Sequence, residues 1–461
     1  MKTPVTAVFD IGNINKKLVL FDEQFQVVHI YSARCEKVQD DDGFPADDLQ
    51  FIKQWAIDTW NELLADSRFQ VKALNFTTYG ATLMHIDEQG NDVTPLYSYL
   101  KEFPKDLHEQ FHATYGNPLD FALETCSPPL GMLNSGLQIY WLKYKKPHLF
   151  ERIRYTLHFP QYMAHLFTGK VTTEYTSIGC HTAMWNFKKR DYHQWIKDEG
   201  IINILPDFAT SPVIDYKEYN GVQIPIGTGI HDSSSSLRTY LYMLEKSFLL
   251  LSFTGTWCIT LNPFEYAPLK PEDLLRDCLL YMTVQGRGIR SARFFLGNEH
   301  AYQTERMAKH FDKPIDYFKS VKFDFDLFEK AQAEEDNLDK KLKPHFFTEE
   351  GTIKKEETTE DWNLSVFENY EEAYHRFFFD MVMYLKPSID ITVKKRFPEN
   401  IVVDGGYAKN EVFLNTLKEI YNEATILVAD IPEGIAIGAA LFINQYLNPQ
   451  MPKPNLKFVK I

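Results

Sequence analysis

The sequence predicts an α/β fold, and three observations lead to this prediction. Short apolar, β-branched segments alternate along the chain with longer segments in which apolar residues recur at helical spacing. Several of the short segments end in a turn that contains glycine. The succession of strand, glycine turn and strand near Gly12 has a counterpart near Gly255, which weakly indicates two related halves.

The first half opens with a predicted β-hairpin. Residues 5–9 and 18–21 are its strands, and Gly12 lies in the turn between them. Apolar residues at helical spacing predict a helix over residues 48–64, with Asp47 or Asp48 as its N-cap. The remaining elements expected in this half are strands at residues 26–30 and 71–76 and helices at residues 137–150 and 161–167.

The second half repeats the hairpin pattern, with strands predicted at residues 248–253 and 257–261. A charged stretch at residues 311–362 is typical of solvated helices and loops. The last helix, at residues 434–446, contains Ala and Gly and is expected to pack closely against a neighbour. Between these lie two further predicted helices and a strand, at residues 368–385, 409–421 and 401–403.

The composition of the chain limits the classes of function that it can have. The chain has 461 residues, and its 49 Lys and Arg against 63 Asp and Glu give a net charge of −14, which disfavours broad nucleic-acid binding. Its five cysteines form no C-x-x-C pair, so reduced thiols are expected. The longest apolar run is far shorter than the ~20 residues of a membrane span. A soluble cytoplasmic protein is therefore predicted.

No P-loop, dinucleotide-binding fingerprint or zinc motif occurs in the sequence. Among the remaining glycine turns, the first contains Asp10, Gly12 and Asn13, with Lys17 following in the next strand. Glycine lets backbone amides approach an anion, and a neighbouring carboxylate can hold a hydrated Mg²⁺. Taken alone, a plain hairpin turn explains this segment better.

Two further glycine turns lie in the second half. Thr254-Gly255-Thr256 offers hydroxyls and amides to phosphate oxygens, although alone it too is better explained as a plain turn. In Gly405-Gly406, followed by Asn410, the glycines would let a base or ribose lie against the backbone, and a structural turn explains them about equally well.

A fourth segment places His231-Asp232 before four serines. Asp232 has two interpretations, as the N-cap of a helix or as a carboxylate that accepts a proton from a hydroxyl. This segment alone favours neither.

Taken in order, these four segments resemble the FGGY family of carbohydrate kinases, over nearly the whole chain. Asp10-x-Gly12…Lys17 is similar to its first phosphate motif, 254–256 to its second, and 404–410 to its adenosine motif. Residues 77–82 resemble its sugar-facing loop, and residues 435–441 its closing helix. Residues 133–143, with Asn134 and Trp141-Leu142-Lys143, are similar to a helix of fuculokinase- and rhamnulokinase-like members.

The resemblance implies two actin-like (ribonuclease H-like) α/β domains of the sugar kinase/Hsp70/actin superfamily. Residues 1–246 would carry the sugar site and the catalytic Asp232, and residues 247–461 the nucleotide site. Substrate-binding residues would be Thr78, Tyr79, Gly80 and His231. Nucleotide and phosphate ligands would be Gly12, Asn13, Lys17, Thr254, Gly255, Thr256, Gly405, Gly406 and Asn410. Asp10 would bind Mg²⁺.

The implied activity is transfer of the γ-phosphoryl group of ATP to a ketose such as L-fuculose or L-rhamnulose, with ATP and Mg²⁺ as cofactors. The implied partner is a small sugar, without nucleic acid or membrane, and the oligomeric state is left open with a homodimer as one candidate. The family usually has hydroxyl side chains where Asn13-Ile14 stand, and its Trp-x-Asp-x-Arg sugar motif is absent. Three alternatives therefore stay open: a xylulokinase- or ribulokinase-type pentulose kinase, a sugar-binding pseudokinase with weak turnover, and a chaperone- or filament-type ATPase.

Overall fold

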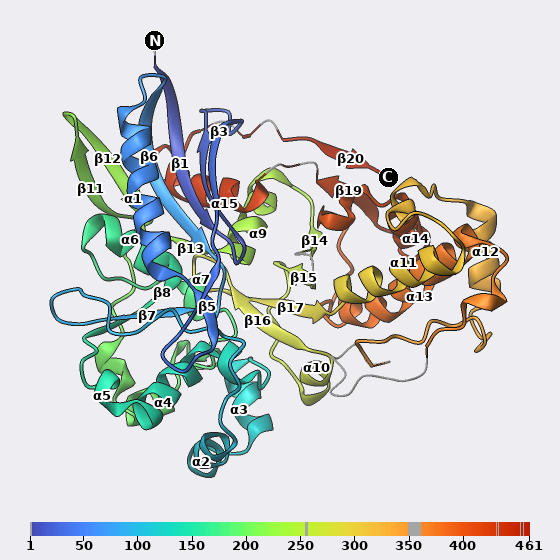
Figure 1. The fold of residues 1–461 in the computed structure, drawn as a ribbon, viewed down its shortest axis with the longest axis horizontal. Coiled ribbons are helices and arrows are strands. Elements are labelled where there is room, and N and C mark those ends of the chain that lie inside the picture. Colours follow the sequence, from blue (N-terminus) through green and yellow to red (C-terminus); the bar gives the residue numbers. More distant parts are fainter. Residues whose placement is uncertain are drawn as a thin grey trace. The chain divides into compact units, whose positions relative to one another are not determined.

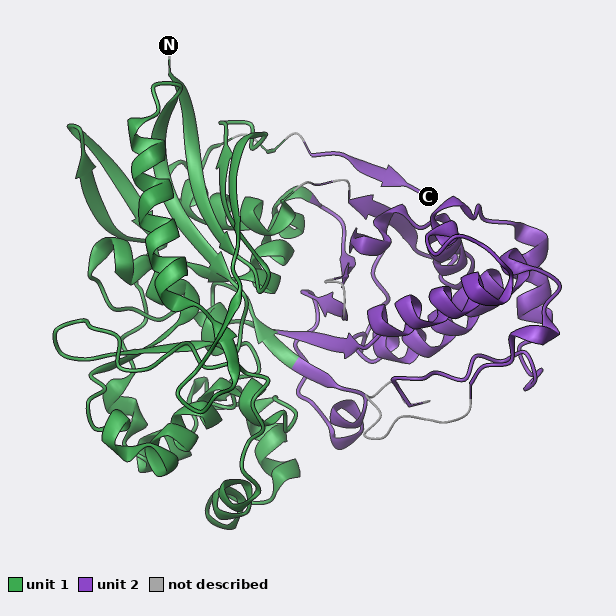
Figure 2. Ribbon diagram, viewed as in Figure 1, with its two compact units in different colours: residues 1–243, 280–288, 432–455 green, residues 244–279, 289–431, 456–461 purple. Residues whose placement is uncertain are grey.

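The protein forms two compact units, coloured separately in Figure 2. The computed structural model describes residues 2–253, 257–348, 361–429, 431, 433–451, 453–454 and 456–461. Unit 1 comprises residues 1–243, 280–288 and 432–455, and unit 2 comprises residues 244–279, 289–431 and 456–461. The end of the chain thus returns to unit 1 with the helix α15 (Gly434–Leu447) before its last residues join unit 2.

Unit 1 is built on a mixed sheet with the order β11-β12-β6-β1-β2-β3, and β13 pairs with β6 (Figure 1). The central strand β1 pairs antiparallel with β2 and parallel with β6. Its residues are mostly buried, which explains their continuous apolar character. The strands are β1 (Thr3–Ile11), β2 (Asn15–Phe21), β3 (Val27–Arg34), β6 (Phe69–Thr78), β11 (Val213–Tyr219), β12 (Val222–Gly227) and β13 (Ile230–His231).

Helices cover both faces of this sheet. The helix α1 (Leu49–Ala65) begins at Asp48, whose side chain accepts from the Phe51 amide, as the sequence predicted for one of two aspartates. Together with α6 (Phe159–Thr168) it packs on alternate residues of β1, including Phe9. On the other face, α15 packs beside α9 (Asp232–Met243). These two helices meet closely, because a Cβ on Gly438 would lie 1.7 Å from the Ser235 carbonyl oxygen.

A helical region with its own apolar core completes unit 1. The single helix expected at residues 137–150 is wrong, because the chain forms two helices that are separated at Lys146. Pro147 cannot continue the preceding helix, since it lacks an amide hydrogen. The helices of this region are α2 (Lys105–Tyr115), α3 (Pro118–Thr125), α4 (Ser135–Lys145), α5 (Pro147–Phe150), α7 (Tyr175–Ile178) and α8 (Gln194–Asp198).

Unit 2 repeats the plan of unit 1. Its sheet has the order β16-β17-β15-β14-β18-β19-β20. In the order β17-β15-β14-β18-β19 the successive pairings are antiparallel, antiparallel, parallel and parallel. The order β3-β2-β1-β6-β12 in unit 1 has the same succession of pairings. The strands are β14 (Phe248–Phe253), β15 (Cys258–Asn262), β16 (Cys278–Met282), β17 (Gly288–Phe294), β18 (Asn400–Gly405), β19 (Thr425–Ala429) and β20 (Phe458–Lys460). The two hairpins that suggested related halves therefore occupy equivalent places in two similar sheets.

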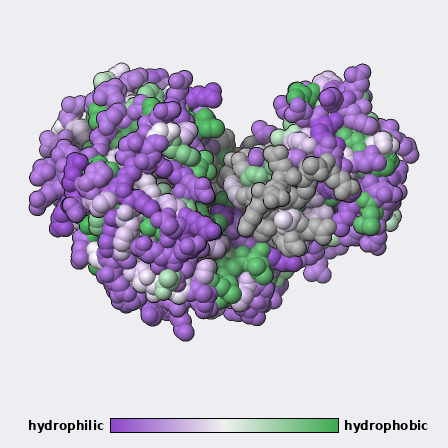
Figure 3. All heavy atoms as spheres, turned by 60° about the horizontal axis from the view of Figure 1, so that its bottom comes forward, coloured by the Kyte–Doolittle hydropathy of each residue, from purple (hydrophilic) through white to green (hydrophobic). Residues whose placement is uncertain are grey.

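The helices of unit 2 pack on a large aromatic core. The longest, α13 (Tyr370–Asp390), runs past the predicted end at residue 385 and includes Pro387. The others are α10 (Pro271–Leu275), α11 (Gly297–His310), α12 (Phe325–Ala333) and α14 (Glu411–Ile420). In the described part of the chain no helix is both long and apolar enough to cross a bilayer, and the molecular face drawn in Figure 3 is mainly hydrophilic.

Candidate active site

The candidate catalytic residues of unit 1 lie where three parallel strands end. Asp10 pairs with Thr77 in the register of β1 and β6, and His231 pairs with Thr78 in the register of β6 and β13. Asp232 follows directly as the first residue of α9. In α/β sheets, ligands usually bind at the carboxyl ends of parallel strands. The fold therefore brings together two aspartates that are 222 positions apart in the sequence.

Asp232 has a carboxylate that is fixed on one side and partly open. Its Oδ1 accepts hydrogen bonds from the Ser233 amide and, at 3.0 Å, from the Ser233 hydroxyl. The His231 Nε2 lies 3.2 Å from the same oxygen. The side chain of Asp232 is 27% exposed. A carboxylate that is held in place and still reachable can accept a proton from a bound hydroxyl.

His231 is the buried neighbour of this carboxylate. Burial lowers the pKa of its imidazole, although Asp232 acts to raise it, so the ring is neutral at pH 7. Its Nε2 also lies 3.2 Å from the Cys180 Sγ, and Gly80 approaches the ring so closely that a Cβ there would lie 2.7 Å from Nε2. Its Nδ1 is buried and has no partner among the described residues. This nitrogen is therefore an unpaired polar atom in a buried position.

The sugar-facing loop predicted at Thr78, Tyr79 and Gly80 lies beside His231. The Thr78 hydroxyl is buried and donates to the Tyr79 carbonyl oxygen at 3.0 Å, and the Tyr79 hydroxyl donates to Asp47. These two side chains hold the loop, whereas Gly80 borders His231 directly. The roles of all three in binding a substrate stay predictions.

Asp10 lies in a field of three other charged groups. Burial, and after it the carboxylates of Asp232 and Glu433, raise the pKa of Asp10 to about 7, while Lys17 acts in the opposite direction. Lys17 is itself ion-paired with Glu433 at 2.8 Å. This excess of carboxylate oxygens is a donor set that suits a hard divalent cation such as Mg²⁺. An ion bound here would relieve the carboxylate repulsion that raises the pKa of Asp10.

A close cluster of three carboxylates occurs elsewhere in the described chain, at Asp40, Asp41 and Asp42. Its charge is balanced by Lys101 and Lys146, which contact these aspartates at 2.5–2.7 Å. Asp10, Asp232 and Glu433 do not form such a close group. A Mg²⁺ bound at Asp10 would therefore keep much of its water shell, as this ion usually does.

The first phosphate turn is closed by a hydrogen bond from the Gly12 amide to the Asn15 carbonyl oxygen, at 3.0 Å. The side chain of Asn13 is engaged, since its Oδ1 accepts from Lys37 at 2.7 Å and its Nδ2 donates to the Tyr99 hydroxyl at 3.2 Å. Asn13 therefore offers an anion its backbone amide and not its side chain.

The residues of the adenosine motif lie in unit 2. Gly405 ends β18 with φ +88°, and a Cβ there would lie 2.2 Å from the Phe253 carbonyl oxygen, so only glycine fits. Gly406 has open space in the direction of a Cβ. Asn410 is the N-cap of α14 and donates to the Tyr374 hydroxyl at 2.8 Å. The predicted phosphate residues Thr254, Gly255 and Thr256 lie outside the described residues.

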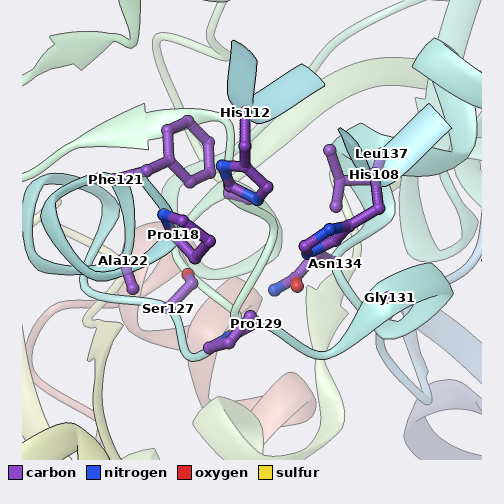
Figure 4. Close-up of a pocket in the computed structure, with 11 residues that line it drawn as sticks. His108, His112, Pro118, Phe121, Ala122, Ser127, Pro129, Gly131, Asn134 and Leu137 are labelled. Atoms are coloured by element: carbon purple, nitrogen blue, oxygen red, sulfur yellow. The ribbon is translucent and has the colours of Figure 1, made fainter. Parts of the chain in front are cut away.

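The segment that suggested a fuculokinase- or rhamnulokinase-like subtype borders a small pocket of about 50 Å³ in the helical region of unit 1 (Figure 4). His108 and His112 of α2 contribute to its walls. Asn134 also lines this pocket, but its amide accepts from the Leu130 amide at 2.7 Å and donates to the His181 carbonyl oxygen at 2.8 Å. Asn134 therefore stabilises its own loop.

Sequence reasoning missed Glu433, Cys180 and Lys16. Glu433 directly precedes the predicted closing helix and has a positive φ of 58°, yet its partner Lys17 is 416 residues away. Cys180 belongs to a segment without a recognised motif. Lys16 stands next to the lysine that the motif singled out, and both precede the strand predicted at residues 18–21. The strand β2 includes both lysines, so their side chains point to opposite faces of the sheet.

Two sheets of one topology, with aspartates at the ends of parallel strands, define the two-domain sugar kinase fold of the actin-like ATPase superfamily. A profile of the N-terminal domain of the FGGY family of carbohydrate kinases matches residues 5–237, which is half of the chain. The chain therefore belongs to the FGGY family and is a sugar kinase, a phosphotransferase that uses ATP. No curated protein sequence matches the chain.

Solved structures show the same fold. A carbohydrate kinase from Novosphingobium aromaticivorans has a TM-score of 0.80 at 20% identity, with 100% of this chain and 94% of that chain covered. Ligand-bound xylulose kinase from Lactobacillus acidophilus has a TM-score of 0.79 at 17% identity, with 99% of this chain and 93% of that chain covered. Gluconate kinase from the same organism has a TM-score of 0.78 at 16% identity, with 100% of this chain and 93% of that chain covered. These identities support the fold, and the fuculokinase-like subtype stays a prediction.

Proposed function

We propose that the protein transfers the γ-phosphoryl group of ATP to a hydroxyl of a small ketose, with Asp232 as the general base. The observation that carries this proposal is the Asp232 carboxylate, which is held by Ser233, lies beside His231 and is 27% exposed at the ends of β6 and β13. The sugar would lie beside Gly80 and His231, which adjoin the Asp232 carboxylate.

In the proposed step the proton of the sugar hydroxyl passes to Asp232. The hydroxyl oxygen forms a bond to the γ-phosphorus, and the bond from this phosphorus to the bridging oxygen breaks, which leaves ADP. Mg²⁺ at Asp10 would neutralise phosphate charge. The backbone amide of Asn13, in the turn that contains Gly12, and the ammonium of Lys17 would orient the phosphates, and Gly405, Gly406 and Asn410 would bind adenosine. Such catalysis depends mainly on positioning and electrostatics.

The test of the general base is Asp232→Asn, which keeps the size and the hydrogen-bonding shape of the side chain. We expect kcat to fall on the order of 10²-fold or more, with the KM of the sugar within several-fold. Asp92→Asn is the matched control, since Asp92 is a partly buried carboxylate of the same unit that binds Lys53 and Tyr162. Near-normal turnover of Asp232→Asn would remove Asp232 from its role.

For the substrate we propose a 6-deoxyketose such as L-fuculose or L-rhamnulose, on the resemblance of residues 133–143. The second candidate is a pentulose, which the fold similarity to xylulose kinases favours. A methyl group discriminates by only ~1–3 kcal/mol, so some activity on pentuloses is expected in either case. The choice between these two substrate classes is tested by measuring kcat/KM for L-fuculose, L-rhamnulose, xylulose, ribulose, gluconate and glycerol. A clear preference for a pentulose or gluconate would refute the 6-deoxyketose proposal.

The same panel separates the kinase from a sugar-binding pseudokinase, which would bind a sugar but consume little ATP. ATP consumption that does not depend on any sugar would instead indicate a chaperone-type ATPase. A cytoplasmic location is part of the proposal, since the five cysteines, all of them described and buried, form no disulfide. Light scattering of the purified chain would test the homodimer.

A further inference from the structure

Lys16 is a fully buried lysine directly behind the first phosphate turn. Its side chain is 0% exposed, and its Nζ donates to the carbonyl oxygens of Gly12 at 2.7 Å and Asn13 at 2.9 Å. Burial lowers the pKa of this ammonium, although Asp47 acts to raise it. A buried ammonium is costly unless it is well hydrogen-bonded. Both hydrogen bonds of Lys16 go to carbonyl oxygens of the turn, so Lys16 fixes the conformation of this loop.

The two carbonyl contacts determine where the loop amides point. The carbonyl and the amide N–H of one trans peptide unit point in opposite directions. With the carbonyls of Gly12 and Asn13 directed at Lys16, the amides of Asn13 and Ile14 point away from it. Neither amide donates to another described residue. Two successive free amides form a nest that suits an anion such as a phosphate.

Asp47 connects this loop to the sugar-facing loop. Its carboxylate is 3% exposed, and one oxygen lies 3.7 Å from the Lys16 Nζ. The same oxygen accepts from the Tyr79 hydroxyl, and the other accepts from Lys37 at 2.8 Å. The Lys16 ammonium also lies 5.9 Å from the centre of the Tyr79 ring. One buried carboxylate is thus shared by the phosphate turn and the loop that borders His231.

A second set of contacts returns from the sugar side to the phosphate turn. The rings of Tyr79 and Tyr99 lie 6.4 Å apart, and Tyr99 accepts from Asn13 at 3.2 Å. Asn13 in turn accepts from Lys37, the other partner of Asp47. The contacts therefore form a closed cycle, in which neither loop can shift without breaking a hydrogen bond or separating the two rings.

We propose that Lys16 is a positioning residue that presents the amides of Asn13 and Ile14 to the phosphates of the nucleotide, and that Asp47 and Tyr79 couple this arrangement to the sugar-facing loop. The proposal rests on the proposed function. Lys16 would thereby supply through the backbone the phosphate contacts that hydroxyl side chains at positions 13 and 14 would otherwise make. Bound sugar would also strengthen nucleotide binding, and the effect would be reciprocal.

Binding of the non-hydrolysable analogue AMP-PNP with Mg²⁺, measured by calorimetry, tests both parts. Lys16→Met keeps the length of the side chain and removes its donors, so we expect AMP-PNP affinity to fall at least about tenfold. Tyr79→Phe removes only the hydroxyl on Asp47. At a sugar concentration that saturates the variant, it should abolish the gain in AMP-PNP affinity that the best sugar of the panel produces in the wild type.

Tyr162→Phe is the matched control, because Tyr162 is also a buried tyrosine whose hydroxyl donates to an aspartate that pairs with a lysine, here Asp92 and Lys53. It should keep both the affinity and the sugar effect. The proposal is overturned if Lys16→Met binds AMP-PNP like the wild type, or if Tyr79→Phe and the control retain the same sugar effect. If Lys16→Met does not fold, Tyr79→Phe decides alone. Failure of the wild type to bind AMP-PNP would overturn the proposed function as well.

Discussion

Gly80→Ala is a small change that should displace His231 in the candidate catalytic centre. The added Cβ would lie 2.7 Å from Nε2 and 2.9 Å from Cδ2 of His231, and 3.3 Å from the Cys180 Sγ. An ordinary contact of 3.4 Å requires the imidazole to move by about 0.7 Å. Cys180 and the ring of Tyr281 pack against this imidazole, so it cannot move without disturbing its neighbours.

The displacement acts on catalysis through Asp232. His231 Nε2 lies 3.2 Å from the Asp232 carboxylate, so a shift of the imidazole by several tenths of an ångström alters the immediate surroundings of this carboxylate. Misplacement of a catalytic group by about 1 Å can lower a rate by about 10²-fold. We therefore expect kcat to fall by about 10- to 100-fold, or about 1.4–2.7 kcal/mol in activation free energy. Overpacking should lower the free energy of unfolding by about 1–3 kcal/mol.

Steady-state kinetics and urea unfolding of the same preparations measure the two effects separately. Gly288→Ala serves as the control, since its added Cβ would approach Phe187 no closer than 3.3 Å. This variant should keep kcat within about twofold of the wild type. Unchanged kcat in Gly80→Ala would show that the position of His231 does not matter to the reaction, and the proposed site would then be wrong in its central contact.

Three further predictions follow from the charged and titratable groups. Asp10→Ala should abolish most phosphoryl transfer and shift the Mg²⁺ titration of activity to higher concentration while the protein stays folded, because Asp10 already carries unfavourable burial and carboxylate repulsion; an unchanged titration curve would contradict the metal role. Glu433→Gln removes the ion pair that holds the Lys17 ammonium in place. It should lower kcat/KM for ATP by about 3- to 10-fold, with little change in the KM of the sugar. An equal loss for both substrates would point to a general structural defect. Burial lowers the pKa of His85 from 6.5 to about 3, so the unfolded chain takes up this proton first as pH falls, and this part of the stability is complete above pH 6.5 and lost below it. Between pH 7.5 and 5.5 the loss through His85 is about 1.4 kcal/mol, and His85→Gln, compared with the wild type by urea unfolding at both pH values, should lack it.

Local patterns in the sequence were sufficient to predict most elements of the fold. The hairpin around Gly12 and the helix α1 follow from periodicity and capping, which depend only on near neighbours. The single helix expected at residues 137–150 was wrong because the break at Pro147 separates two segments that are both apolar. The contribution of α15 to unit 1 could not be predicted from periodicity, since it depends on packing against α9, about 200 residues earlier.

The candidate site was predictable only where a motif marks it. Asp10 and Asp232 were singled out because each lies in a segment that resembles a family motif, and the parallel pairing of β1, β6 and β13 explains why they share one end of the sheet. Glu433 and Lys16 were not found, because their partners are a distant lysine and two backbone carbonyl groups. Every residue has a backbone carbonyl group, so residue types alone do not reveal which carbonyl accepts a hydrogen bond.

The substitution of hydroxyl residues by Asn13-Ile14 bears on the choice between a kinase and a pseudokinase. A hydrogen bond to a charged phosphate is worth about 1.5–3 kcal/mol, so two lost hydroxyls could remove much of the binding of the γ-phosphoryl group. The backbone amides of the same two residues remain free, and Lys16 holds the carbonyls that orient them. Asp10, Lys17 and Asp232 are all present and gathered in one unit. The backbone amides of this loop can therefore replace the missing hydroxyls in binding a phosphate. ATP consumption measured with the sugar panel separates turnover from binding alone.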